Sequence, residues 1–543
     1  MKKQSFLKGA LIISLGGALA KILGAFYRIP LANILGGTGL GIYQMTYPLY
    51  CLLLTLSATG IPSGLARAVS RAEASGDLAR SEGLLHRSLL LFTAIGLAGS
   101  AAMFYLAPAM SAAQGEPAAA AAYRALAPGV ALVSALSCFR GWFQGRSNFV
   151  PTALSEVLEQ AVKIGFGLYF AHLFAQDVSR AVAYTLFAVT LSEAAAVVFM
   201  FFCASGHLRI RAFLFRRQGA AARSGGAWGA FLRGGSSFGT GLPLYPDASS
   251  RPSPSCLLRA TVPVAVAAGI LPLSNILDSI LIVRLVGRYA ENATALYGLY
   301  SGGAATLINL PVSVCYGLAA ASVPALAALC ARGNASAAEE KALFAVKCTL
   351  FVSLPAAAFL LCYPSQLAGF LFRSIAGTEG AMLARLVRAS ALSSVFLALT
   401  QTLSACLTGM GRAKTAAAAM TLAVSVKLIL ECILLRVPQI SVLGAAYASA
   451  ACYLVALFVD LVYSIREREN RTRAAGYFLK FALAGAACAA AAWPLRNAHV
   501  LLIFAVSSAV YLLFAVAFGA FTAEELRPFL RRKRHDHDRR AGV

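Results

Sequence analysis

Two positively charged side chains lie inside a segment that is otherwise long and apolar. Leu11–Ile34 is long enough to cross the roughly 30 Å hydrocarbon core of a bilayer, yet it contains Lys21 and Arg28. The two residues lie about two helical turns apart and therefore share one helical face. A Lys or Arg at mid-bilayer costs at least ~2.5–3.5 kcal/mol, which favours a watery or protein-lined interior. We predict that this face lines a cavity that receives an anion; the alternative is snorkelling or structural pairing.

Ionisable side chains recur inside other apolar segments. Glu156, Glu159 and Lys163 follow at i, i+3 and i+7 and share one helical face. Lys427 and Glu431 lie at i and i+4. Acids and bases at this spacing can neutralise each other, so both sets are candidates either for structural ion pairs or for the wall of a cavity. A place near the cytoplasmic end, where water reaches them, is a further alternative for the two glutamates of the first set.

Asp278 has no close partner on its own helix, which favours a functional role for it as a coupling or cavity acid. Prolines interrupt the same apolar segments, and broken or kinked membrane helices are typical of substrate cavities and their hinges. Proline is also frequent in membrane helices in general. The candidate hinge residues are Pro62, Pro263, Pro272 and Pro311.

The composition places these residues in a polytopic membrane protein. The chain has 543 residues, of which 59% are hydrophobic and 13% charged, and apolar runs of membrane-spanning length recur throughout. The runs are continuously apolar and not alternating, so the predicted class is all-α. The net charge of +25 resides largely in loops and indicates membrane topology, not nucleic-acid binding.

About fourteen membrane-spanning helices are predicted. They cover 8–34, 42–66, 87–112, 121–144, 150–174, 179–204, 261–286, 295–320, 342–365, 382–408, 414–435, 440–464, 475–495 and 499–521. Basic residues concentrate in the loops on the side of the N-terminus, for example in 67–87 and 466–473. The positive-inside rule therefore predicts a multi-pass protein of the bacterial cytoplasmic membrane with both termini in the cytoplasm, which agrees with an even number of spans.

A long connector and an internal repeat divide the chain. The predicted parts are an N-terminal lobe (1–204), a flexible basic cytoplasmic linker (205–260), a C-terminal lobe (261–465), two further helices (466–521) and a basic tail (522–543). Two spacings recur in both lobes and favour pseudo-repeated six-helix bundles. Gly41-Ile42-Tyr43 and Gly60 match Gly298-Leu299-Tyr300 and Gly317, and Gly145 with Lys163 matches Gly409 with Lys427.

Motifs for enzyme chemistry are missing from the sequence. Gly409–Thr415 has the wrong spacing for a phosphate-binding loop, and Gly36–Gly41 is a glycine-rich helix junction without a preceding strand. The twelve cysteines form no C-x-x-C motif and give no indication of a metal site. We therefore expect neither an enzyme nor a bound cofactor.

Several short segments form a recognisable signature, namely Lys21–Arg28, Leu35-Gly36, Gly41–Tyr43 and Gly60–Ala66, followed by Gly141–Gly145 and Asn275–Asp278. These segments resemble the stage V sporulation protein B / polysaccharide biosynthesis branch of the multidrug/oligosaccharidyl-lipid/polysaccharide flippase superfamily. The resemblance implies two six-helix lobes forming a V around a central cavity, with two extra C-terminal helices. Its lipid II flippase members move an undecaprenyl-pyrophosphate-linked sugar from the inner to the outer leaflet.

The resemblance also implies roles for individual residues. Essential basic residues on the first helix of that branch match Lys21 and, within one position, Arg28. An acid near Gly41 and basic residues within Cys51–Ser57 are missing here, which leaves open which polyprenyl-linked glycan is carried. A pyrophosphate needs cations in a low-dielectric cavity. The candidates are Lys21, Arg28, Lys163 and Lys427, and an inside-negative membrane potential or an ion gradient would drive export.

Two other functions remain open from the sequence. A cation-coupled multidrug exporter of the same superfamily would use Asp278 or Glu156 as its coupling site. A non-transporting scaffold would instead recruit envelope-synthesis enzymes through the linker 205–260. The polyprenyl-linked glycan flippase is the main prediction.

Overall fold

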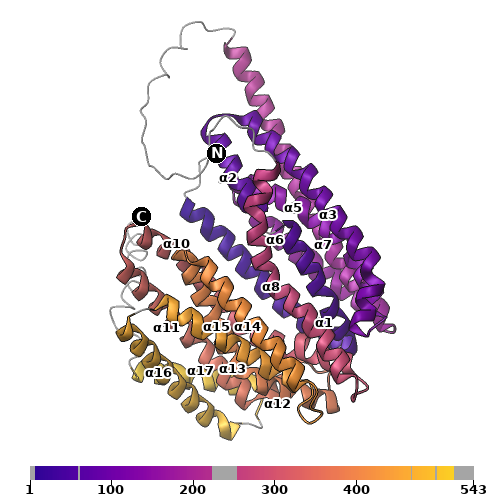
Figure 1. Cartoon of the computed structure of the whole chain (residues 1–543), viewed down its shortest axis with the longest axis vertical. Coiled ribbons are helices and arrows are strands. Elements are labelled where there is room, and N and C mark those ends of the chain that lie inside the picture. The colour runs from indigo at the N-terminus through magenta and orange to yellow at the C-terminus, as the bar shows by residue number, and fades with distance from the viewer. Residues whose placement is uncertain (1–5, 59–60, 223–253, 466, 496–497, 519–543) are drawn as a thin grey trace, which may run out of the picture.

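The protein is a bundle of long helices. The computed structural model describes residues 6–58, 61–222, 254–465, 467–495 and 498–518, and these ranges contain helices and short connections but no strand (Figure 1). The all-α class predicted from the sequence is confirmed. The predicted tail 522–543 lies outside the described residues.

The first helix, α1 (Phe6–Ala58), bends sharply at one glycine. A straight helix of 53 residues would be about 80 Å long at 1.5 Å per residue, more than twice the thickness of a hydrocarbon core. Gly36 has φ 67° and ψ −174°, a conformation that residues with a Cβ rarely adopt. The bend brings Arg28 and Tyr47 from the two parts of α1 into the lining of one cavity.

The first bundle contains the helices up to residue 222. After α1 come α2 (Ile61–Ala74), α3 (Leu78–Gln114), α4 (Ala119–Leu126), α5 (Pro128–Gly145), α6 (Val150–Leu173) and α7 (Val178–Ala222). Asp77 caps α3 by accepting a hydrogen bond from the Arg80 backbone N–H. Within the bundle α6 packs on α7, and α5 packs on α2, α3 and α7.

The second bundle begins with α8. Its helices are α8 (Pro254–Val286), α9 (Ala293–Tyr297), the π-helical turn η1 (Gly298–Ala304), α10 (Ala305–Ala331), α11 (Ala335–Cys362), α12 (Pro364–Leu371), α13 (Gly377–Gly409), α14 (Ala413–Leu434) and α15 (Leu443–Ser464). Here α13 packs on α10, α11 and α15, and α14 packs on α8 and α15. The two bundles lie side by side in Figure 1.

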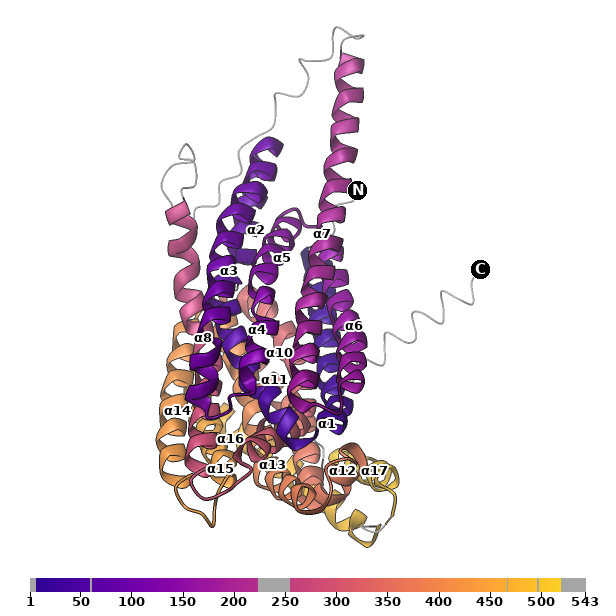
Figure 2. The same cartoon turned by 90° about the vertical axis from the view of Figure 1, so that its right-hand side faces the viewer.

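Two C-terminal helices cover the outer side of the second bundle. They are α16 (Arg468–Ala492), which ends in the short helix η2 (Trp493–Leu495), and α17 (Val500–Ala517). Both lie at the outer side of the second bundle in Figure 1, and α17 lies beside α12 in Figure 2. Glu339 of α11 accepts hydrogen bonds from the Glu467 backbone N–H and the Asn470 side chain at the start of α16. Tyr511 of α17 donates to the Phe351 carbonyl of α11.

Ten helices among the described residues are long and apolar enough to cross a membrane. The predicted total of fourteen is therefore not confirmed. The predicted span 150–174 coincides with α6, which is not among the ten because Glu156, Glu159 and Lys163 make it less apolar.

The connector between the bundles is shorter than the predicted 205–260. The helix α7 continues to Ala222 and α8 begins at Pro254, while 223–253 lies outside the described residues. The glycine, serine and proline content that suggested a linker is concentrated after residue 222. The residues just before it are rich in leucine, alanine and arginine, which favour helix formation and extend α7.

Contacts between the bundles gather at the end where α1 bends. In this part of the structure Asn33 donates to the Leu371 carbonyl at 2.7 Å and accepts from the Ser374 N–H at 3.0 Å. Gln114 donates to the Ser279 hydroxyl at 2.8 Å, a bond buried between α3 and α8. These bonds hold the two bundles together at one end of the cavity described below.

The matched glycines of the repeat meet at this same end. A Cβ on Gly298 would clash with the Gly37 carbonyl and lie 2.5 Å from the Gly41 nitrogen. A Cβ on Gly41 would clash with the Thr294 carbonyl. The two equivalent positions therefore form a backbone-to-backbone contact between the bundles that only glycine permits.

Replacing Gly298 tests the backbone contact between the bundles. Gly298→Ala should lower the stability of the purified protein by about 1–3 kcal/mol, because the added methyl forces the bundles apart. Thermal unfolding in detergent measures the effect. Gly317→Ala is the matched control, since a Cβ there meets no atom within 4 Å, and equal unfolding temperatures for both variants would contradict the contact.

Candidate functional site

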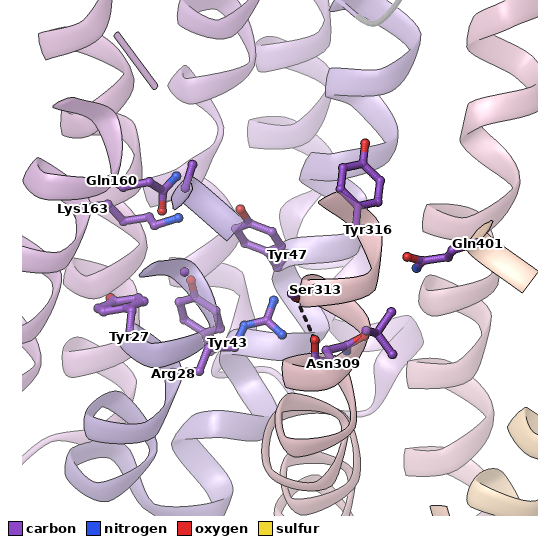
Figure 3. A pocket seen from close by; sticks show the side chains of 13 residues that line it. Tyr27, Arg28, Tyr43, Tyr47, Gln160, Lys163, Asn309, Ser313, Tyr316 and Gln401 are labelled. Atoms are coloured by element: carbon purple, nitrogen blue, oxygen red, sulfur yellow. Dashed lines mark hydrogen bonds between the residues drawn. The ribbon is translucent and has the colours of Figure 1, made fainter. Parts of the chain in front are cut away.

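A polar cavity of about 380 Å³ lies between the bundles (Figure 3). Both parts of α1, together with α6, form one wall, and α10 and α13 form the other. Its polar and charged lining residues are Tyr27, Arg28, Tyr43, Tyr47, Gln160, Lys163, Asn309, Ser313, Tyr316 and Gln401. This lining suits a polar or charged ligand far better than an apolar one.

A second cavity of about 360 Å³ adjoins the first and extends into the second bundle. Arg28, Tyr47 and Asn309 line both cavities, so they stand where the two meet. The second cavity also contains Asp278 of α8 and Lys427 of α14. Together the two cavities join the charged residues of α1, α6, α8 and α14 in one central site.

Arg28 and Lys163 provide positive charge on the first-bundle side. Both side chains are half-buried, and their charges repel each other. Figure 3 shows them approaching the cavity from α1 and α6. Neither makes an ion pair within the described residues, so the site offers two cations to an incoming ligand.

Glu159 does not neutralise Lys163 by a close ion pair, although the two share a helical face. Its carboxylate instead binds Arg140 of α5, with Nη2 and Oε2 2.9 Å apart. Arg140 also donates from Nε to the Ser155 hydroxyl at 3.0 Å. The sequence interpretation did not include Arg140, although an arginine inside an apolar segment is the same signal that identified Arg28.

Lys427 lies between two carboxylates on the second-bundle side. Its Nζ forms a hydrogen-bonded ion pair with Oδ2 of Asp278 and lies 3.8 Å from Oε1 of Glu431. All three side chains are buried, and Glu431 is fully inaccessible. The partner that Asp278 lacks on α8 is thus supplied by α14, which packs against it.

The other predicted site residues lie elsewhere. Glu156 of α6 does not line the two cavities, and its buried Oε2 lacks a hydrogen bond among the described residues. Pro272 lines the second cavity. Pro62 stands in the first turn of α2, and Pro311 is half-buried in α10.

Two predicted residues cannot be placed at the level of their side chains. Lys21 belongs to α1 and Pro263 to α8, but the side chains of both lie outside the described part of the structure. Their proposed roles in anion binding and hinging stay predictions.

Amide and tyrosine side chains complete the central site. Gln160, Asn309 and Gln401 line the first cavity, and Tyr300 of the second cavity hydrogen-bonds to the Ser449 hydroxyl at 2.6 Å. The sequence analysis concentrated on charged residues and did not identify these groups. Neutral polar residues in membrane helices are common at helix contacts, so their presence alone does not identify a cavity.

Comparisons with known proteins relate the two halves of the chain to two families. Residues 6–223 match the family described as Polysaccharide biosynthesis protein, and residues 263–433 match the family described as MatE. The two matches correspond closely to the first bundle and to the part of the second bundle that ends within α14.

Relatives and a solved structure agree with these matches. Stage V sporulation protein B of Bacillus subtilis is 28% identical over 331 residues, which cover 60% of this chain and 59% of that protein, less than two thirds of its length. Lipid II flippase MurJ of the same organism is 23% identical, covering 84% of this chain and 82% of that protein. A solved Lipid II flippase MurJ in an inward closed conformation superposes with a TM-score of 0.68 at 13% identity, covering 93% of this chain and 98% of the other.

The buried ion pair can be tested through stability. Lys427→Met should destabilise the protein by about 3–5 kcal/mol, because it leaves buried carboxylates without their ammonium partner. Thermal unfolding of the purified protein measures this loss. Asp177→Asn breaks an exposed ion pair with Arg180 and should change the stability by less than about 1 kcal/mol. Similar losses in the two variants would show that the Lys427 cluster is not electrostatically important.

Proposed function

We propose that the chain is a membrane flippase or transporter of the multidrug/oligosaccharidyl-lipid/polysaccharide flippase superfamily, which its matches to the two families and to the relatives support, and that its substrate is a polyprenyl-pyrophosphate-linked glycan. An undecaprenyl-linked cell-envelope precursor such as lipid II is the proposed cargo. It would move from the inner to the outer leaflet by alternating access. The observation that carries this proposal is the pair of cations, Arg28 and Lys163, on one wall of the central cavity.

The chemistry of the cavity supports an anionic glycan. Arginine and lysine bind phosphate oxygens through charge-assisted hydrogen bonds, which gain strength where water is excluded. The amides of Gln160, Asn309 and Gln401 provide donors and acceptors of the kind that sugar hydroxyls require. The polyprenyl tail would stay in the bilayer while the headgroup crosses.

The proposed membrane location and the proposed driving force both depend on charge. We propose a location in the bacterial cytoplasmic membrane with both termini in the cytoplasm, as the distribution of basic loops predicts. Moving one charge across the membrane is worth ~2.3 kcal/mol per 100 mV. An inside-negative potential therefore favours the export of an anion, and neither a nucleotide nor another cofactor is needed.

Alternating access fits the arrangement of the contacts. The hydrogen bonds of Asn33 and Gln114 hold the bundles together beside the bend of α1. Rocking of the bundles would break these bonds and close the opposite end. Pro272 and Pro311 belong to helices that line the cavity and are the proposed hinge positions.

A cation-coupled multidrug exporter is the second candidate, and the match of residues 263–433 to MatE favours it. Its predicted coupling acid, Asp278, is already occupied by the Lys427 ammonium. Glu156 does not line the described cavities. A scaffold that recruits envelope-synthesis enzymes would not need a polar, charged cavity between the bundles, so the cavity favours transport over this alternative.

Neutralising the two cations tests the substrate class. Arg28→Gln and Lys163→Gln should each weaken binding of undecaprenyl pyrophosphate by about 10- to 100-fold, since a hydrogen bond to a charged group contributes about 1.5–3 kcal/mol. Native mass spectrometry of the detergent-purified protein provides the affinities. Lys414→Gln, at an exposed position on α14, is the control. Unchanged affinity in both cavity variants would contradict the proposed binding site.

Depletion of the protein in its host tests the direction and the cargo. Cells that lack it and any redundant flippase should accumulate one lipid-linked glycan in the inner leaflet, because synthesis continues while export stops. Mass spectrometry of extracted lipids identifies the precursor. Loss of ethidium efflux without accumulation of a precursor would favour the multidrug exporter instead.

A further inference from the structure

Glu159 and Lys163 are spaced so that they could neutralise each other along α6. Glu159 precedes Lys163 by four residues, and this order is favoured over the reverse order for an ion pair along a helix. The two charges are close enough to attract each other, yet within the described residues they form no ion pair. Another group therefore holds the carboxylate and leaves the ammonium of Lys163 to the cavity.

Arg140 and Gln160 occupy both oxygens of the Glu159 carboxylate. Arg140 of α5 donates from Nη2 to Oε2 at 2.9 Å, and the Gln160 amide donates to Oε1 at 3.4 Å. The guanidinium is itself fixed, because its Nε donates to the Ser155 hydroxyl at 3.0 Å. Ser155 is buried and donates to the Thr152 carbonyl at 2.7 Å. A planar guanidinium held at two of its nitrogens binds a carboxylate more rigidly than a flexible ammonium does.

The ion pair of Arg140 and Glu159 stands behind the cavity wall. Lys163 and Gln160 line the first cavity, whereas neither member of the ion pair lines either of the two central cavities. Both paired side chains are 17% exposed, so a carboxylate that lost Arg140 would bear much of the cost of an unpaired charge. Lys163, one helical turn away on the same helix, is the cation that would relieve this cost.

The other acids near Lys163 are less well placed to pair with it. Glu193 of α7 also attracts the ammonium, but it is buried, and its Oε1 accepts a hydrogen bond from the Tyr50 hydroxyl at 3.2 Å. Glu156 lies two helical turns before Lys163, and like Glu193 it does not line the cavities. Glu159 is therefore the acid whose position decides whether Lys163 stays unpaired.

We propose that Arg140 is a positioning residue of the central site, which binds Glu159 and thereby keeps the Lys163 ammonium free for an anion in the cavity. A pyrophosphate that joins a sugar to a lipid carries negative charge on each phosphate, so it matches the two cations of this wall, Arg28 and Lys163. If Glu159 paired with Lys163, Arg28 alone of the two would stay unpaired. The role of Arg140 in holding Glu159 stands on the geometry, while its effect on anion binding rests on the proposed function.

Anion binding tests the role of Arg140. Arg140→Gln should weaken binding of undecaprenyl pyrophosphate by about 10-fold, because the released carboxylate pairs with Lys163. Arg140→Gln/Glu159→Gln should restore the affinity to within about threefold of the unmodified protein, because a glutamine cannot neutralise the ammonium. Native mass spectrometry of the detergent-purified protein gives the affinities. Arg180→Gln, which breaks an exposed ion pair with Asp177 at 3.1 Å, is the control and should leave the affinity unchanged.

Chemical labelling tests the ion pairs without any substrate. A small water-soluble amine reagent such as acetic anhydride modifies a lysine that water can reach, and a carboxylate bound to the ammonium slows the reaction. Peptide mass spectrometry after brief labelling gives the rate at Lys163, with the exposed Lys414 of α14 as the internal standard. We expect a rate several-fold lower in Arg140→Gln than in the unmodified protein, and a normal rate once Glu159→Gln is added.

Two results overturn the proposal. One is an unchanged labelling rate at Lys163 in Arg140→Gln, which would show that Glu159 does not turn towards it. The other is a double variant that binds the lipid as weakly as Arg140→Gln although Lys163 is labelled normally, which would make Arg140 a structural link between α5 and α6.

Two further measurements keep the test decisive. Arg140→Met, which keeps the packing of the arginine stem, repeats both experiments if the glutamine variant does not fold. If undecaprenyl pyrophosphate does not bind the unmodified protein, the proposed substrate is wrong, while the labelling still decides whether Arg140 keeps Lys163 free.

Discussion

The cost of an unpaired charge away from water is the constraint on which this structure depends. Arg140 and Glu159 meet it by pairing with each other at 2.9 Å in the first bundle. Asp278 and Lys427 meet it by pairing between α8 and α14. Arg28 and Lys163 avoid this cost in another way, because they line the polar cavity, where water or a ligand can reach them. Two cations without an ion pair among the described residues are therefore gathered at the cavity that is the proposed binding site.

The bend at Gly36 gives these charges their position. It folds α1 so that Arg28, before the bend, and Tyr43 and Tyr47, after it, line the same cavity. Just beyond the bend, Gly41 brings α1 into backbone contact with the start of η1 at Gly298. One short glycine-rich segment thus shapes the binding wall and also joins the two bundles.

Much of the fold could be predicted from the sequence because it depends on local patterns. Length and continuous apolar character located α3, α13 and α15, and the glycine run 36–41 located the bend. The predicted connector 205–260 overlaps the end of α7 and the start of α8, because the amino-acid composition of the whole connector was considered together. Helix formation there depends on the residues nearest to each bundle.

The site could be predicted only in part, because its partners come from different helices. Helical spacing showed that Glu159 could reach Lys163, but it could not show that Arg140 of α5 would bind Glu159 instead. In the same way, Asp278 has no partner on α8 itself, and the packing of α14 places Lys427 beside it. The charged residues were recognisable from their apolar surroundings, whereas their pairing depends on contacts far apart in sequence.

The repeat explains why the two halves of the site differ. Lys163 and Lys427 are equivalent positions, each eighteen residues after a matched glycine. The spacing from Gly41 to Gly298 also relates Lys21 to Asp278, because the two pairs are separated by the same number of residues. In the second bundle this position provides a carboxylate that binds Lys427. In the first bundle the same sequence position is a lysine, and Lys163 makes no ion pair among the described residues. A single difference in charge between equivalent sequence positions therefore accompanies the contrast between a cavity wall with unpaired cations and a wall on which the lysine is paired with acids.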